Sequence, residues 1–234
     1  MTNPRIIVAL DYSDPRKALA LASQLSPDLC RLKVGSELYT QAGPQLLGQL
    51  QNLGYSVFLD LKFHDIPNTV ARACRVATEL GVWMLNIHAM GGRRVMEAAR
   101  LAVDQAGVSR RPLLLAVTVL TSMTDSDLAE LGVMGGAAGQ VMRLAALAAD
   151  SGLDGVVCSG REVVSLRETY PGLVLVTPGI RSANAQEDDQ RRTMTASQAR
   201  AAGADYLVVG RPVTLSDNPL QSLLTINSEI SYIS

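Results

Sequence analysis

Three charged residues lie close together in the segment LDLKFHDIPNT, where Asp60, Lys62 and Asp65 end an apolar run. Because side chains alternate along a strand, Asp60 and Lys62 are expected to share a face with Phe58. An ammonium fixed beside carboxylates can stabilise developing negative charge and deliver a proton. A plain ion pair at a strand end is the alternative, but buried charges are costly unless they are partnered or used. The segment therefore favours a functional site.

The elements that would position this segment alternate regularly along the chain. Expected strands cover residues 5–10, 30–34, 55–61, 83–88, 113–120, 154–159, 173–177 and 205–210. Expected helices cover residues 14–25, 36–53, 67–80, 92–106, 138–151, 161–170 and 195–202, and a last helix follows Arg211. Alternation of this kind implies parallel strands joined by right-handed crossovers.

Eight such βα units are the number that closes a TIM-type barrel. A doubly wound sheet is the alternative, but its Gly-rich fingerprint is missing after the first expected strand, where the chain reads DYSDP. We therefore predict an α/β fold in which residues 1–234 form a single (β/α)8 barrel domain.

Polar residues gather where the expected strands end, which is the edge at which such barrels build their active sites. Asp11 closes the first strand, Lys33 lies near the end of the second, and Thr121 follows the fifth. These residues are expected to surround the same opening as Asp60 and Lys62.

A phosphate-binding pattern follows the eighth expected strand. Gly210 lets the backbone approach a ligand closely, and the guanidinium of Arg211 offers a planar fork for phosphate oxygens. The long polar segment 178–192 contains Arg181 and Gln190. Long segments of this kind are often lids, although a solvated surface loop would have a similar composition.

Composition excludes several other classes of protein. Lys and Arg number 21 against 22 Asp and Glu, so no overall field favours nucleic acid or an anionic membrane. The longest uncharged apolar run is far shorter than the ~20 residues of a membrane helix, and the N-terminal stretch does not have the pattern of a signal peptide. We expect neither a nucleic-acid nor a membrane partner.

The cysteines and histidines give no sign of a metal site. Cys30, Cys74 and Cys158 are far apart and form no C-x-x-C motif, which argues against a disulfide framework or a zinc cluster. We expect them to be buried and reduced in a cytoplasmic protein. His64 and His88 have no third ligand at metal-binding spacing, so structural roles are expected for both.

Motifs spread over almost the whole chain carry a family resemblance. They are VALDYSD, CRLKVGSELYT, DLKFHDIPNT, GVWMLNIHAMGG, AVTVLTSM, LDGVVCS, VTPGIR, DQRRTMT and YLVVGRPVT. With them the chain resembles the bacterial orotidine 5′-phosphate decarboxylases. The D-x-K-x-x-D core alone is shared with related sugar-phosphate decarboxylases and synthases. That branch typically has an acidic Mg²⁺ ligand after its second strand, whereas this chain has Lys33, which favours the metal-free branch.

The resemblance implies decarboxylation of orotidine 5′-monophosphate to UMP in pyrimidine nucleotide synthesis, with neither a metal nor an organic cofactor. Lys62 would stabilise the C6 carbanion and protonate it, within a catalytic network of Lys33, Asp60, Lys62 and Asp65. The implied substrate-binding residues are Asp11, Lys33, Asp60, Lys62, Asp65, Thr69, Thr121, Arg181, Gln190, Gly210 and Arg211.

These residues divide by the part of the nucleotide that each would hold. Asp11, Lys33 and Thr69 would contact the ribose, and Thr121 the pyrimidine. The phosphate and the loop over it would be held by Arg181, Gln190, Gly210 and Arg211. The implied active unit is a homodimer in which Asp65 and Thr69 enter the neighbouring subunit's site.

Two other functions stay open from the sequence. One is a Mg²⁺-dependent sugar-phosphate decarboxylase or synthase, which Lys33 argues against. The other is a non-catalytic nucleotide-binding module, which would have no reason to retain Lys62 between two carboxylates.

Overall fold

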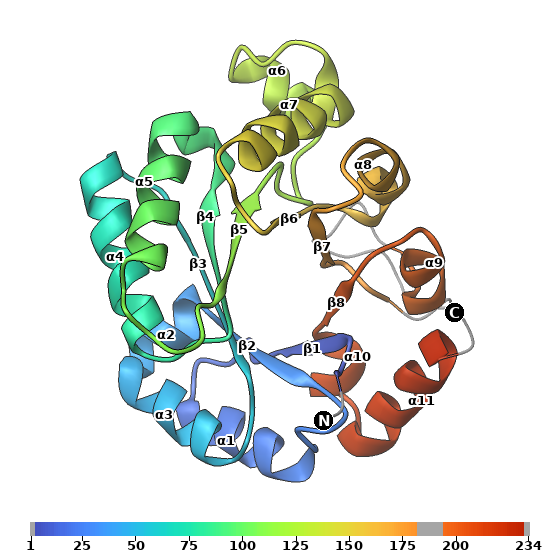
Figure 1. Ribbon diagram of the computed structural model, residues 1–234. Helices are drawn as coiled ribbons and strands as arrows, with labels where there is room; N and C mark the ends of the chain where they lie inside the picture. The colour runs from blue at the N-terminus through green and yellow to red at the C-terminus, as the bar shows by residue number, and fades with distance from the viewer. Residues whose placement is uncertain (1–2, 182–193, 232–234) are drawn as a thin grey trace.

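A closed barrel of parallel strands forms the centre of the molecule (Figure 1). The computed structural model describes residues 3–181 and 194–231. Its strands are β1 (Ile6–Ala9), β2 (Arg31–Gly35), β3 (Val57–Phe63), β4 (Met84–His88), β5 (Leu113–Val117), β6 (Gly155–Val157), β7 (Val174–Thr177) and β8 (Tyr206–Val209). Each strand pairs with the next, and β8 pairs with β1 to close the ring. The predicted (β/α)8 fold is confirmed.

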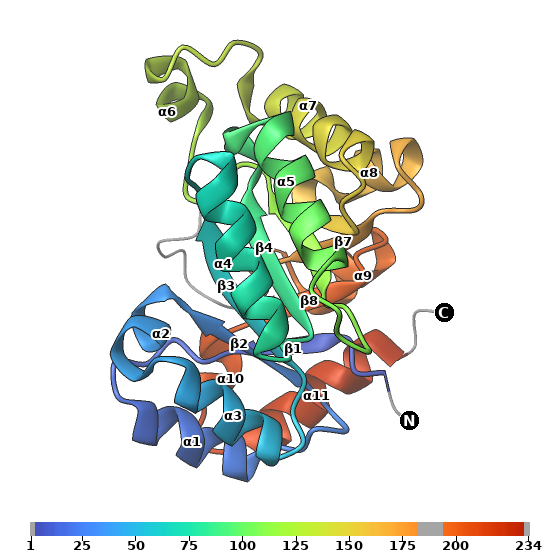
Figure 2. The same ribbon diagram turned by 60° about the vertical axis from the view of Figure 1, so that its left-hand side comes forward.

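Helices surround the barrel on its outer side (Figures 1 and 2). They are α1 (Pro15–Gln24), α2 (Ser36–Ala42), α3 (Pro44–Asn52), α4 (Pro67–Glu79), α5 (Arg93–Asp104), α6 (Asp125–Glu130), α7 (Gly136–Asp150), α8 (Val163–Thr169), α9 (Ala196–Ala201), α10 (Arg211–Thr214) and α11 (Pro219–Ser231). Two 3₁₀ turns, η1 (Ala89–Gly91) and η2 (Gly160–Glu162), follow β4 and β6. No helix in the described ranges is long and apolar enough to cross a bilayer.

Three helical predictions need correction. The helix expected over residues 36–53 is two helices, because Gly43 adopts a φ of 65° and Pro44 starts α3. The helix expected after Arg211 is also two, α10 and α11. The short helix α6 was not predicted, and a capping box between Thr124 and Asp127 starts it.

Apolar side chains fill the inside of the barrel below the strand ends. The inner cluster consists of Ile7, Ala9, Phe58, Met84, Leu115, Val176, Tyr206 and Val208. Trp83 packs against this cluster with its ring edge-to-face on Tyr206, and the Arg31 guanidinium lies 4.2 Å from the centre of the Trp83 ring. The barrel is therefore a packed core rather than a pore.

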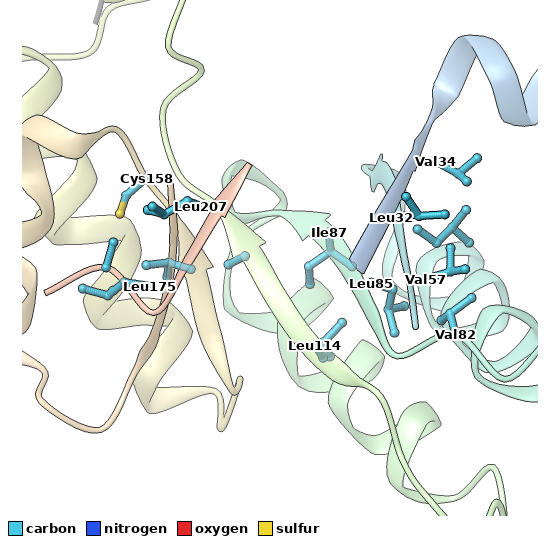
Figure 3. Packing of buried hydrophobic residues seen from close by; sticks show 14 of the residues in the cluster. Leu32, Val34, Val57, Val82, Leu85, Ile87, Leu114, Cys158, Leu175 and Leu207 are labelled. Atoms are coloured by element: carbon cyan, nitrogen blue, oxygen red, sulfur yellow. The ribbon is translucent and has the colours of Figure 1, made fainter. Parts of the chain in front are cut away.

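The opposite faces of the strands pack under the helices and form the larger part of the core (Figure 3). The labelled residues of this outer layer are Leu32, Val34, Val57, Val82, Leu85, Ile87, Leu114, Cys158, Leu175 and Leu207. Residues of β3 alternate accordingly, with Val57 and Leu59 in the outer layer and Phe58 in the inner one. This alternation directs Asp60, the next residue of the Phe58 face, toward the barrel mouth.

Candidate active site

A cavity of about 670 Å³ opens at the carboxyl ends of the strands. Eight of the predicted site residues line it: Asp11, Lys33, Asp60, Lys62, Thr121, Arg181, Gly210 and Arg211. They lie in or after β1, β2, β3, β5, β7 and β8. Residues far apart in sequence converge here because parallel strands end at one edge. The cavity is thus assembled from the strand-end residues that the sequence singled out.

A chain of alternating charges crosses one wall of this cavity. The Nζ atom of Lys33 lies 3.0 Å from Oδ1 of Asp11 and 3.3 Å from Oδ2 of Asp60. The other Asp60 oxygen, Oδ1, lies 2.8 Å from Nζ of Lys62. The Lys33 and Asp60 side chains are only 10% and 11% exposed, whereas Lys62 is 38% exposed. The two inner charges therefore anchor an outer ammonium that faces the cavity.

The inner charges hold each other ionised. Burial would raise the pKa of Asp60, but the Lys33 and Lys62 charges and its hydrogen bonds together bring that pKa below its ordinary value. Burial would likewise lower the pKa of Lys33, but Asp60 and Asp11 raise it above its ordinary value. Lys33 and Asp60 are therefore both charged at neutral pH.

The backbone at Lys62 departs from a regular strand. Lys62 has a φ of 50°, in the left-handed region that residues with side chains seldom adopt. The pairing of β3 with β4 shifts register between Leu59 and Phe63 at the same place. A residue held in this region costs about 1–3 kcal/mol and persists only where its surroundings enforce it. Lys62 still lines the cavity, as the alternation predicted.

Asn86 is a residue of the site that the sequence analysis missed. Its Nδ2 donates to Oδ1 of Asp60 at 2.7 Å, and its Oδ1 accepts from the backbone N–H of Lys62 at 2.8 Å. The side chain is fully buried in β4. A signal was available, because Asn is uncommon inside strands and here interrupts the apolar run MLNIH.

The segment that follows β8 carries two of the predicted phosphate residues. Gly210 precedes α10 and Arg211 begins it, and both line the cavity. Tyr12 and Lys17 also line the cavity, although neither was predicted. The Tyr12 hydroxyl donates to the carbonyl of Thr214 at 3.1 Å and so ties the end of β1 to α10.

The predicted lid segment, 178–192, is described only over residues 178–181. Gly179 and Arg181 line the cavity, and a β-bridge joins Ile180 to Met194. The Arg181 backbone N–H donates to the Met194 carbonyl at 3.0 Å. Gln190, the remaining residue predicted here, lies outside the described residues.

Asp65 and Thr69 do not line this cavity. Both are exposed, and the Asp65 carboxylate accepts from the N–H of Ile66 at 2.6 Å. Asp65 lines a separate open groove with His64, Ile66, Pro67, Met90, Gly91, Arg94 and Val95. Neither residue therefore contributes to the cavity of this chain.

The histidines and cysteines show no arrangement for a metal. The rings of His64 and His88 stack 5.2 Å apart, and Nδ1 of His88 accepts from the Met90 N–H. Burial, His64 and Lys62 together lower the pKa of His88. Over residues 3–181 and 194–231, no three His, Cys, Asp or Glu side chains gather as metal ligands.

Comparison with known proteins gives the chain a family. The model of the "Orotidine 5′-phosphate decarboxylase / HUMPS family" matches residues 4–226. This chain belongs to that family.

Similar proteins of known name support the orotidine 5′-phosphate decarboxylase side of the family. An orotidine 5′-phosphate decarboxylase of Chromobacterium violaceum is 57% identical over 231 residues, which cover 98% of this chain and 93% of the relative. One of Laribacter hongkongensis is 58% identical over 227 residues, covering 97% and 93%. The crystal structure of orotidine 5′-phosphate decarboxylase from Lactobacillus acidophilus superposes with a TM-score of 0.87 at 36% identity, covering 97% of this chain and 99% of that one.

Proposed function

We propose that this protein removes CO₂ from orotidine 5′-monophosphate to give UMP, in pyrimidine nucleotide synthesis. It is then a carbon–carbon lyase, as its relatives' names indicate. One observation carries the proposal: the Lys62 ammonium faces the cavity while its partner Asp60 is buried and tied to Lys33. We further propose that the whole chain acts as one barrel domain.

The reaction needs a fixed positive charge. When the bond between C6 and the carboxylate breaks, its electron pair stays on C6 in an orbital in the ring plane, which the ring π-system cannot delocalise. An ammonium already in place stabilises that pair without reorganising at the moment of reaction. Lys62 then transfers a proton from Nζ to C6 and is reprotonated from solvent. In this scheme the protein's own charges carry the chemistry, with no cofactor.

Asp60 and Lys33 hold the charge in position. The Asp60 carboxylate bridges the two lysines, so Lys62 cannot swing away without breaking a 2.8 Å contact to a buried anion. Breaking this contact would remove one of the two cations that compensate the buried Asp60 charge, which is unfavourable. Asp60, Lys33 and Lys62 therefore act as one preorganised unit.

The rest of the nucleotide would lie along the cavity. Asp11 and Lys33 suit the ribose hydroxyls as acceptor and donor, and Thr121 suits the pyrimidine. Arg211, Gly210 and Arg181, which follow β8 and β7, suit the phosphate, together with Gln190 in the undescribed segment. Binding energy from the remote phosphate can then be used at the reacting carbon.

We propose that the active unit is a homodimer in which Asp65 and Thr69 of one subunit enter the site of the other. Their exposed position outside the subunit's own cavity supports this arrangement. So does the apolar surface beside them, where Ile66 is 66% and Met90 44% exposed. A second copy packed there would bury this surface and bring a carboxylate to the Lys62 ammonium.

A mixing experiment tests the shared site. Lys62→Ala and Asp65→Ala are each expected to be nearly inactive, but a heterodimer has one site with both native residues. Random exchange of subunits should therefore restore about a quarter of the wild-type activity. If a mixture of the two variants is shown to contain heterodimers and still has no activity, the shared site is refuted.

We place the protein in the cytoplasm. Cys30, Cys74 and Cys158 are all buried free thiols, as the sequence predicted, and burial raises the pKa of Cys30 and Cys74 to about 12. Inert thiols of this kind suit a reducing compartment. Fractionation of cells with an antibody against the protein would test the placement.

Loss of the orotate absorbance tests the reaction itself. The purified protein should convert orotidine 5′-monophosphate to UMP with release of one CO₂ per turnover. A non-catalytic nucleotide-binding module would bind the nucleotide and leave the absorbance unchanged. A sugar-phosphate enzyme would not convert orotidine 5′-monophosphate. Either result would refute the proposed function.

A further inference from the structure

Asn86 occupies the junction between the two residues on which the proposed reaction depends. It lies in the middle of β4, and its side chain is fully buried. One end of its amide donates to the Asp60 carboxylate at 2.7 Å, and the other accepts from the Lys62 backbone at 2.8 Å. One side chain thus fixes both the carboxylate and the backbone that carries the ammonium.

The irregular pairing of β3 and β4 explains why a side chain is needed there. Leu59 pairs with Leu85 and Phe63 with Ile87, so β3 takes four steps where β4 takes two. The residues of β3 between these pairs have no regular ladder partners on β4. The Asn86 amide oxygen accepts the Lys62 N–H in place of a backbone carbonyl, at the point where φ of Lys62 is positive.

The Asp60 carboxylate depends on the same amide. Its Oδ1 accepts from two donors, Nδ2 of Asn86 at 2.7 Å and Nζ of Lys62 at 2.8 Å, while Oδ2 faces Lys33. Without the amide donor, the Asp60 carboxylate would lose its one contact to a neutral, rigidly held group. Its remaining contacts would be to the ammonium groups of Lys33 and Lys62, whose side chains are long and flexible. Its plane, and the position of the Lys62 ammonium with it, would be less defined.

We propose that Asn86 is a positioning residue that fixes the Lys62 ammonium for proton delivery through two bonds, one to Asp60 and one to the Lys62 backbone. This inference rests on the proposed function. Asn suits the place because it is neutral, short and both donates and accepts. Leu has its approximate size and can do neither, whereas Asp can accept but donates only when it is protonated.

The substitution Asn86→Leu separates positioning from binding. It should lower kcat about 100-fold, the scale of losing one preorganised contact at a reacting centre, and should leave KM within about threefold. The matched control is Thr78→Val, which removes a buried hydrogen bond to the Cys74 carbonyl in α4, away from the cavity. The control should keep wild-type kcat even if it unfolds at lower urea concentration.

The substitution Asn86→Asp adds a pH-dependent readout. The new carboxylate would face Asp60 and could hold the Asp60 contact only with a shared proton. The other titratable groups nearby are Lys62 in β3 and Lys33 in β2, both paired with Asp60. His88 lies on β4 with Asn86, and the His64 ring stacks on it. The ratio of variant to wild-type kcat should rise as the pH falls from 8 to 5, whereas loss of packing alone would give a constant ratio.

The outcomes are distinguishable from failure of the proposed function, because wild-type turnover is measured first. With an active wild type, unchanged kcat for Asn86→Leu, or a constant ratio for Asn86→Asp, overturns the inference. If the wild type is inactive, the crystal structure of Asn86→Leu tests whether Asn86 positions Lys62. Displacement of Lys62 from its positive φ supports the positioning role, and an unchanged Lys62 overturns it.

Discussion

The ammonium nitrogen of Lys62 lies 2.8 Å from Oδ1 of Asp60, and the two side chains differ sharply in exposure. Asp60 is 11% exposed and Lys62 38%, so the anion is fixed inside the barrel wall and the cation reaches into the cavity. A surface ion pair would leave both partners mobile and contribute little. Here the buried member orients the accessible one, which is the arrangement that a preorganised electrostatic catalyst requires.

The stability of the protein should depend on the ionisation of Asp60. A carboxyl whose pKa is lower in the folded state stabilises the fold above its unfolded pKa of about 4, and that stabilisation disappears as the pH falls through the lowered folded value. Asp60→Asn should therefore unfold at lower urea concentration than wild type at pH 7, and the difference should narrow below about pH 4. A difference that is constant with pH would contradict this linkage.

The phosphate contact should contribute to turnover as well as to binding. Arg211→Ala should lower kcat/KM about 100-fold, since hydrogen bonds to charged groups contribute about 1.5–3 kcal/mol. Free phosphite should then increase wild-type turnover of orotidine, which lacks the phosphate. Arg16→Ala removes the same charge from an exposed side chain outside the cavity and should have no effect. Absence of any phosphite effect would argue against coupling between phosphate binding and the reacting carbon.

Removal of metals should leave the activity intact. Lys33 presents an ammonium to Asp60 at 3.3 Å, at the position where the sugar-phosphate branch is expected to carry an acidic ligand. Neighbouring cations make this wall unfavourable for Mg²⁺, which prefers carboxylate and water oxygens. Exhaustive treatment with EDTA should therefore not change kcat. Activity that vanished and returned with Mg²⁺ would assign the protein to the sugar-phosphate branch.

Local sequence patterns were sufficient to predict the barrel and most of the charged residues that line the cavity. Eight apolar runs are the eight strands, and alternation along β3 correctly placed Asp60 and Lys62 on the cavity side. Strand-end residues such as Asp11 and Arg211 converge because parallel strands share an edge. These features follow from spacing alone, so they can be predicted without tertiary contacts.

The remaining features depend on how neighbouring strands pair. The positive φ of Lys62 follows from a register shift against β4, and nothing in its residue type signals it. Asn86 acquires its role only through the same pairing. The break between α2 and α3 had a local signal in Gly43–Pro44, but the apolar periodicity on either side suggested one continuous helix.

The most direct test of the central claim is the turnover of Lys62→Ala together with its affinity for UMP. Loss of both the stabilising charge and the proton donor should lower kcat at least about 10⁴-fold. The dissociation constant for UMP, measured by calorimetry, should stay within about tenfold of wild type, because the phosphate and ribose contacts are elsewhere. A variant that bound UMP normally and still decarboxylated orotidine 5′-monophosphate at near the wild-type rate would contradict the account.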